Sequence, residues 1–269
     1  MTSTPVAPLN LHYVRSSPVA GLAVAERRVP RPEATIICVH GGLDRGGSFA
    51  RLARRCESFD VVAYDRRGYQ RSRGLKPLSL ADHVEDLVAI ARREAQRGPV
   101  IYFGHSYGGV VALGADLAEP ELARLAAVYE APLPWILVRP DARMPLTDDA
   151  AHESEVFFKR VVSDRAWERL GDAERESRRL DGPGLLSDLA ILRGAAPFDL
   201  GRLATPSVYV HGDWNQADFY RSLCLQLEKV SPMISSRELV HAGHGAHLSN
   251  PDQLAELLHH LWQDQCASR

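Results

Sequence analysis

Short, nearly continuous apolar runs recur along the 269-residue chain, and segments with helical periodicity separate them. Such runs are typical of strands buried on both faces of a parallel sheet, because a strand with one solvated face would alternate polar and apolar residues. The runs span residues 35–39, 60–64, 100–103, 125–129, 207–210 and 237–240. Their alternation with helices predicts an α/β fold with a mostly parallel sheet.

The segments between the runs carry helix signals. Ser79 can cap a helix whose apolar positions fall on one face, and Gly98 and Pro99 can end it. A helical stripe also covers residues 49–56, and Pro251 suits the first turn of a C-terminal helix. Residues 11–28 alternate weakly, which predicts an antiparallel hairpin at the sheet edge.

The alternation of apolar strand runs with helical segments stops between residues 131 and 204. In this stretch apolar residues follow helical spacing among many charged residues. We therefore predict a core made of residues 1–130 and 205–269, interrupted by an inserted helical cap at 131–204. The cap aromatics could wall an apolar acyl site or could simply fill the interior of the cap. They are Trp135, Phe157, Phe158 and Trp167.

Composition excludes several partners. The net charge of -2 gives no excess of positive charge with which to bind nucleic acid. No run approaches the ~20 apolar residues that a membrane span requires. The N-terminus has no secretory pattern, so a cytoplasmic location is expected. The four cysteines have no CxxC spacing, which favours reduced, structural thiols. The sequence says nothing of oligomeric state.

The chemistry centres on residues 104–109, which read Gly-His-Ser-Tyr-Gly-Gly directly after an apolar strand and before a helix-compatible run. A sharp strand-to-helix turn of this type brings backbone close to the serine, so small residues are needed at Gly104 and Gly108. We predict that Ser106 is a nucleophile and that the Tyr107 backbone N–H stabilises an oxyanion. Gly42, at the end of the first parallel strand, is the candidate second donor.

A serine hydroxyl needs a base, and three histidines follow the last strand: His241, His244 and His247. His244 lies between glycines in the loop and is the predicted base, while the other two are alternatives with packing or surface roles. Their even spacing resembles a metal motif but lacks a nearby cysteine or acidic cluster. Neither a metal nor a cofactor is expected.

The order of these motifs resembles that of the α/β-hydrolase fold family. The resemblance rests on residues 40–42, 65–69, 104–109 and 242–244, and it spans nearly the whole chain. It implies an eight-stranded, mostly parallel sheet with helices on both faces, and a cap inserted after the sixth strand, which ends here at Tyr129. Gln70 departs from the pattern, since the family usually has a second glycine there.

The acid of a Ser-His-acid triad is the open question. Relatives that carry it after the seventh strand read Gly-x-x-Asp, but this chain has Asn215 in that place. Other members carry the acid after the sixth strand, where this chain has Glu130, and we favour Glu130 on that basis. Asp213 and Asp218 remain alternatives.

Together these residues predict a serine hydrolase that cleaves a carboxylic ester, or a related acyl bond, of a small and apolar substrate through an acyl-enzyme. Serine at residue 106 argues against the family's dehalogenases and epoxide hydrolases, which use aspartate there. Lactone, thioester and C–C bond hydrolysis remain open, as does a ligand-binding protein without catalysis.

Overall fold

The computed structural model describes residues 10–76, 78–120, 122–138, 147–214 and 216–267. One eight-stranded sheet forms the centre of the molecule, in the order β1-β2-β4-β3-β5-β6-β7-β8. The strands are β1 (His12–Val14), β2 (Val24–Arg27), β3 (Ala34–Val39), β4 (Phe59–Tyr64), β5 (Val100–His105), β6 (Leu125–Tyr129), β7 (Ser207–Gly212) and β8 (Ile234–Leu239). The pairs β1–β2 and β2–β4 are antiparallel, and each neighbouring pair from β4 to β8 is parallel.

Side chains of the central strands point alternately into two hydrophobic cores. In β3, Ile37 and Val39 belong to the core on one face, while Ile36 and Cys38 belong to the core on the other. All four are fully buried. This two-sided burial explains why the strand runs are apolar without interruption.

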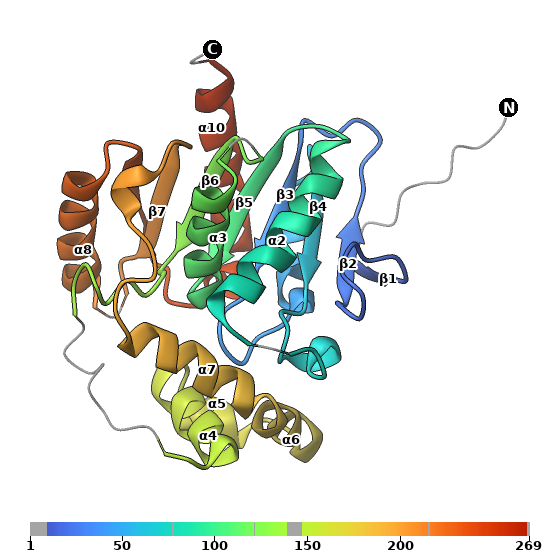
Figure 1. Ribbon diagram of the computed structural model, residues 1–269, viewed down its shortest axis with the longest axis vertical. Helices are drawn as coiled ribbons and strands as arrows, with labels where there is room; N and C mark the ends of the chain where they lie inside the picture. The colour runs from blue at the N-terminus through green and yellow to red at the C-terminus, as the bar shows by residue number, and fades with distance from the viewer. Residues whose placement is uncertain (1–9, 77, 121, 139–146, 215, 268–269) are drawn as a thin grey trace, which may run out of the picture.

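Helices cover both faces of the sheet (Figure 1). On one face lie α2 (Leu80–Ala95), α3 (Tyr107–Ala118) and α8 (Ala217–Val230), which contribute Leu87, Val110 and Leu223 to that core. On the other lie α1 (Ala50–Arg55) and α10 (Pro251–Ala267), which contribute Leu52 and Leu254. The predicted α/β-hydrolase architecture of the sheet and its helices is confirmed.

The start of α2 shows how sequence sets an element boundary. The Ser79 hydroxyl accepts from the backbone N–H of Asp82, and the Asp82 carboxylate accepts from the backbone N–H of Ser79. This reciprocal pair satisfies two N–H groups that the first helical turn leaves free.

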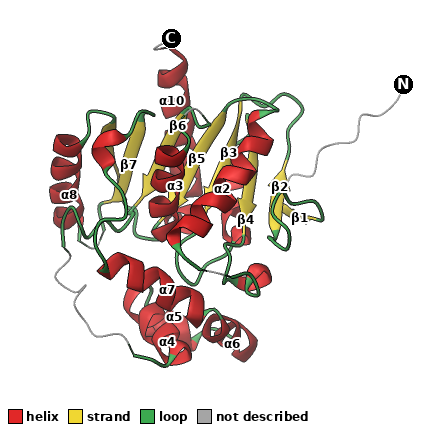
Figure 2. Ribbon diagram, viewed as in Figure 1, coloured by secondary structure: helices red, strands yellow, loops and turns green. Residues whose placement is uncertain are grey.

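Among the described residues between β6 and β7 are four α-helices, called here the inserted helices (Figure 2). They are α4 (Ala150–Val161), α5 (Asp164–Glu168), α6 (Asp172–Leu180) and α7 (Gly182–Arg193). They pack on one another at one end of the sheet, and a buried ion pair joins α7 to the loop after β4. In that pair Arg66 meets Asp188 with N–O distances of 2.6 and 3.2 Å.

Some expected boundaries differ from the observed ones. The helical segment expected at residues 49–56 begins earlier than expected, at Gly46. It consists of a 3₁₀ turn, η1 (Gly46–Phe49), followed directly by α1. The last strand was expected at 237–240 but spans Ile234–Leu239. It is an edge strand with exposed polar positions, so no apolar run marks its start. Two further 3₁₀ turns, η2 (Gln70–Ser72) and η3 (Leu200–Arg202), and the short helix α9 (Ala246–Ser249) complete the described elements.

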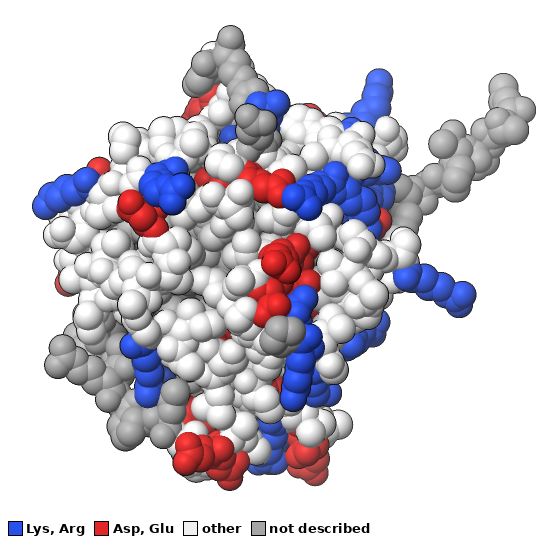
Figure 3. Space-filling model, in the orientation of Figure 1, with Lys and Arg blue, Asp and Glu red and all other residues white. Residues whose placement is uncertain are grey.

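The surface carries charges of both signs. On the face drawn in Figure 3, acidic and basic side chains are intermixed rather than separated into fields. Within the described residues, no helix combines the length and the apolar character that crossing a membrane demands.

Candidate active site

Ser106 stands at the sharp turn from β5 into α3. Its backbone has φ 52° and ψ -127°, a conformation that L-residues rarely adopt. The turn is held because the Ser106 N–H donates to the Tyr129 carbonyl at 2.8 Å and the Gly109 N–H donates to the Ser106 carbonyl at 2.8 Å. Backbone strain of this kind persists only where its surroundings enforce it, and it clusters at functional sites.

The glycines beside Ser106 are required by space. A Cβ at Gly108 would lie 2.1 Å from the Val39 carbonyl oxygen, and one at Gly104 would lie 2.5 Å from the Gly108 carbonyl oxygen. Neither neighbour can give way, because both are backbone. The sequence pattern Gly-x-Ser-x-Gly therefore reports the close crossing of β3, β5 and α3 beneath the serine.

Glu130 directly follows β6 and reaches His244. Its Oε2 atom lies 2.7 Å from Nδ1 of His244, and its Oε1 accepts a hydrogen bond from the Gly212 N–H at 3.0 Å. The residue is 3% exposed. Its own backbone has φ 46°, and its N–H donates to the Val210 carbonyl at 2.8 Å. Hydrogen bonds thus hold both the backbone of Glu130 and one of its carboxylate oxygens, and they leave Oε2 directed at the imidazole.

The loop that carries His244 is held at several points. The Tyr129 hydroxyl donates to the Gly243 carbonyl at 2.8 Å, and the ring of His105 contacts the His244 carbonyl at 2.7 Å through Nε2. The loop crosses Gly212 so closely that a Cβ there would lie 2.0 Å from the Ala242 carbonyl oxygen. These contacts hold the backbone at residues 242–244, which carries the His244 ring.

Ser106 and His244 line one cavity of about 450 Å³, together with Gly42, Tyr107 and Glu130. Within the described part of the chain, no hydrogen bond joins the Ser106 hydroxyl to the His244 ring. Catalytic hydrogen bonds are often long in a free enzyme and shorten when substrate binds, so this geometry is compatible with nucleophile activation.

The two candidate oxyanion donors lie on the same cavity. Tyr107 is the first residue of α3, so its N–H belongs to a helix N-terminus, which carries partial positive charge. Gly42 follows β3, and a Cβ there would lie 3.1 Å from Leu185 of α7. A side chain at residue 42 would therefore narrow the cavity below the inserted helices.

The alternative acids lie elsewhere. Asp213 accepts from the Ala242 N–H at 3.2 Å and so braces the backbone of the histidine loop rather than the His244 ring. Asp218 is exposed and pairs with Arg221 at 3.1 Å. Neither contacts His244. Residue 215, where the sequence has asparagine in place of the expected aspartate, falls outside the described residues.

The two alternative histidines differ from each other. His241 is exposed and has φ 57°. His247 is buried in α9, 3.3 Å from the Asp44 carboxylate, and its ring packs against those of Phe49 and His105. His241 therefore lies at the surface and His247 packs in the interior, which are the two environments expected for the alternative histidines.

Asp188 is one of the polar cavity residues that sequence reasoning did not single out. It lies on α7 and accepts a 2.6 Å hydrogen bond from the Tyr69 hydroxyl besides its ion pair with Arg66. No pattern could have revealed this, because 122 positions separate Arg66 from Asp188 and an isolated aspartate on a helix is ordinarily solvated. The aromatic residues of the inserted helices lie in two different environments. Phe157 lines the cavity, whereas Trp167 packs against Phe158.

A family model described as the alpha/beta hydrolase family matches residues 36–257, which include the turn at Ser106, Glu130 and the His244 loop. The chain belongs to the alpha/beta hydrolase family. This membership agrees with the fold and with the resemblance seen in the sequence.

Curated relatives of this family member include esterases and lipases. It is 28% identical over 245 residues to the pimeloyl-[acyl-carrier protein] methyl ester esterase of Yersinia pseudotuberculosis serotype O:1b (strain IP 31758), covering 83% of this chain and 91% of the relative. It is 31% identical over 96 residues to lipase LipV of Mycobacterium tuberculosis (strain ATCC 25618 / H37Rv), and that match spans only 36% of either chain.

Among solved structures, a lipase-esterase related protein from Clostridium acetobutylicum ATCC 824 superposes with a TM-score of 0.67 and 14% sequence identity. The superposition covers 90% of this chain and 99% of the other. At this identity the likeness shows a shared fold, and function must be argued from the site.

Proposed function

We propose that the protein is a serine hydrolase that cleaves a carboxylic ester, with Ser106 as nucleophile, His244 as general base and Glu130 as the acid of the triad. The observation that carries the proposal is the 2.7 Å contact between the Glu130 carboxylate and His244 Nδ1, on the cavity that Ser106 also lines. A base held by a buried carboxylate beside a strained serine is the arrangement that acyl transfer requires. The esterase and lipase relatives support this class of reaction.

The residues suggest a two-step reaction. The Ser106 oxygen attacks the ester carbonyl while His244 takes the hydroxyl proton, and His244 then returns that proton to the departing alcohol. Water next attacks the acyl-enzyme, and the proton it loses passes through His244 back to Ser106 as the carboxylic acid leaves. The Gly42 and Tyr107 N–H groups would stabilise the negative oxygen in both steps. Glu130 would stabilise the imidazolium between transfers.

The inserted helices would act as a cap over this reaction. Phe157 and Val161 of α4 and Leu185 and Leu189 of α7 present apolar surface to the cavity above Ser106. Such a wall favours an apolar acyl or alcohol group, since burying carbon surface is worth about 25 cal/mol per Å².

Covalent labelling tests the nucleophile. An alkyl fluorophosphonate should form one adduct per chain, and peptide mass mapping should find it on Ser106. The Ser106→Ala variant should keep its fold by circular dichroism and lose both labelling and hydrolysis. Near wild-type hydrolysis by the folded variant would refute the mechanism, and a folded wild type that takes no label would favour a ligand-binding protein.

A substrate panel tests the bond cleaved. We expect p-nitrophenyl esters of intermediate chain length to be turned over faster than the acetate, because longer acyl chains reach Phe157 and Leu185. Lactones and acyl thioesters run in parallel would reassign the natural bond if either exceeded the best ester in kcat/KM. The same triad would serve those bonds.

A further inference from the structure

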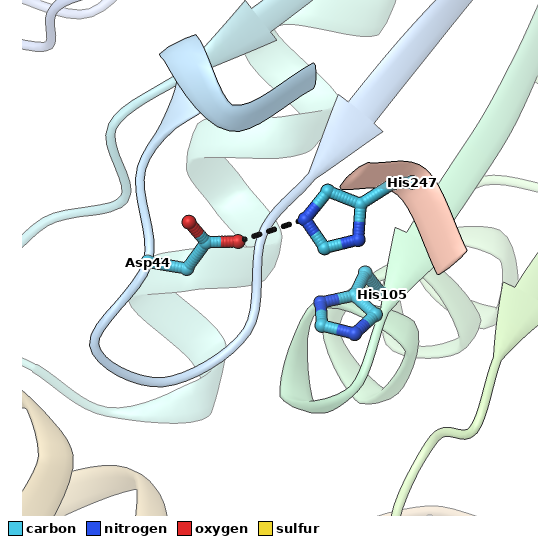
Figure 4. Close-up of side chains that lie close together, drawn as sticks. All are labelled: Asp44, His105 and His247. Carbon is cyan, nitrogen blue, oxygen red and sulfur yellow. Dashed lines mark ion pairs between the residues drawn. The ribbon is translucent and has the colours of Figure 1, made fainter. Parts of the chain in front are cut away.

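Three side chains from distant parts of the sequence lie close together (Figure 4). Asp44 comes from the loop after β3, His105 is the last residue of β5, and His247 belongs to α9. Each offers a ligand atom, and these atoms all lie within 4.8 Å of one another. Figure 4 shows the three side chains pointing toward a common point. We call these residues the Asp44 cluster.

The cluster is buried and incompletely hydrogen-bonded. His105 is 6% exposed and His247 is 2% exposed. In the described residues, Nδ1 of His105 and both ring nitrogens of His247 are buried without a hydrogen-bond partner, and His247 Nε2 faces the Asp44 carboxylate at 3.3 Å. Unpaired ring nitrogens are unusual, because buried polar atoms in native proteins are nearly always paired. A species that accepts the lone pairs of His105 Nδ1 and His247 Nε2 would satisfy one nitrogen of each ring.

The second nitrogen of His105 is already engaged. Its Nε2 lies 2.7 Å from the His244 carbonyl oxygen, which requires the proton on Nε2 and leaves the Nδ1 lone pair free. Metal-binding histidines commonly donate their other ring N–H to a backbone carbonyl in this way, which fixes the tautomer and the ring orientation.

We propose that Asp44, His105 and His247 form a binding site for a divalent transition metal, with Zn²⁺ as the best match. Two imidazoles and one carboxylate are typical zinc ligands, and a fourth position would be left for water. Neighbouring ligands around a tetrahedral zinc ion lie about 3.3 Å apart, given Zn–N bonds of about 2.0–2.1 Å. His247 Nε2 and Asp44 Oδ2 already have this spacing of 3.3 Å, and the three ligand atoms lie within 4.8 Å of one another.

An entry route exists on the Asp44 side. The Asp44 side chain is 23% exposed and lines a second cavity of about 360 Å³, separate in its lining residues from the cavity of Ser106. Arginines also line this cavity, namely Arg45, Arg51, Arg54 and Arg178. Their positive charge repels any divalent cation, so binding depends on the ligands themselves, and imidazole ligands favour zinc over hard cations such as Mg²⁺.

Sequence spacing pointed to only one of these three ligands. Of the evenly spaced histidines, His247 belongs to the cluster, whereas His241 is exposed and His244 faces Glu130. The proposed ligands instead lie 61 and 142 positions apart along the chain, at residues 44, 105 and 247, and folding of the sheet alone brings them together.

Isothermal titration of the metal-free protein with ZnCl₂ tests the proposal. We expect one Zn²⁺ per chain in the wild type. Asp44→Asn and His247→Gln should each weaken binding by ~100-fold or more, because even loss of a ligand's hydrogen-bond partner costs 10–100-fold. His241→Gln, which changes an exposed histidine of the same loop, is the matched control and should bind like the wild type.

Titration with CoCl₂ separates this site from the exposed thiol of Cys266. Cobalt bound by imidazole and carboxylate gives weak visible bands, whereas cobalt bound by thiolate adds an intense near-ultraviolet charge-transfer band. We expect the weak bands alone, and we expect His247→Gln to abolish them. Circular dichroism before titration establishes that each variant is folded, and if Asp44→Asn fails to fold, His247→Gln decides.

Three results would overturn the site. The first is no zinc binding by the wild-type chain when protein and ZnCl₂ are both at roughly tens of micromolar, concentrations at which protein zinc sites are filled. The second is zinc binding that the folded His247→Gln variant retains in full. The third is loss of ester hydrolysis by these variants with unchanged zinc binding, which would mean that the cluster only positions the His244 loop. None of these outcomes bears on whether Ser106 is the nucleophile.

Discussion

The Glu130 carboxylate lies 2.7 Å from Nδ1 of His244, although 114 positions separate the two residues along the chain. The contact exists because β6 and β7 are neighbours in the sheet and Glu130 leaves the end of β6 in a left-handed conformation. That turn directs its side chain across β7 toward the histidine loop. Gly212 helps, since its N–H holds the second carboxylate oxygen.

Glu130→Gln should lower kcat by ~10²–10⁴-fold while leaving KM nearly unchanged, because an amide neither stabilises imidazolium nor fixes the productive tautomer. Steady-state kinetics on a p-nitrophenyl ester measure the effect. Asp213→Asn makes the same chemical change beside the same loop, yet Asp213 contacts only backbone there, so its loss should be much smaller. A larger loss in Asp213→Asn would transfer the role to Asp213.

Asp188→Ala should destabilise the protein by ~3–5 kcal/mol, the usual cost of leaving a buried charge without its partner. Arg66 is fully buried, and Asp188 supplies its two shortest carboxylate contacts. Urea unfolding followed by tryptophan fluorescence gives the free energy of unfolding. Asp172→Ala is the control on α6, where the side chain is fully exposed, and should change stability by no more than ~0.5 kcal/mol. Equal effects in the two variants would contradict a structural role for the Arg66–Asp188 pair.

The sequence predicted the strand-to-helix turn at Ser106 well because the requirements of that turn are local. Strand, serine and glycines are contiguous between β5 and α3, so one short pattern carries the backbone geometry of Ser106. The positions of β3, β4 and β6 could also be predicted from the sequence, since burial of a strand on both faces leaves an unbroken apolar run.

Contacts between segments that are distant along the chain could not be predicted in this way. Glu130 could be favoured over Asp213 through the family pattern, but only the folded chain shows which carboxylate faces His244. Asp188 and Asp44 were missed because each is a single acidic residue whose partner lies far away in sequence. Burial, not residue type, distinguishes them from ordinary surface acids.

Asp116 of α3 allows a prediction about pH and stability. The residue is fully buried, and burial raises the pKa of its carboxyl group to about 6, with contacts to Thr205 offsetting part of the rise. The folded state therefore holds this proton more tightly than the unfolded chain does. Stability is unaffected well below the ordinary aspartate pKa, falls as pH rises from about 4 to 6, and stays reduced above 6.

Asp116→Asn should remove this penalty, because the amide has nearly the shape of the neutral acid and never ionises. A shift of about 2 pKa units corresponds to about 3 kcal/mol, so we expect the variant to be more stable than the wild type by ~1–3 kcal/mol at pH 7.5. The gain should vanish near pH 4, where both forms are neutral in the folded state. Urea unfolding at several pH values measures the difference, and Asp172→Asn, on an exposed site, should show no such trend. A pH-independent difference between Asp116→Asn and the wild type would mean that the carboxyl group keeps its ordinary pKa in the folded protein.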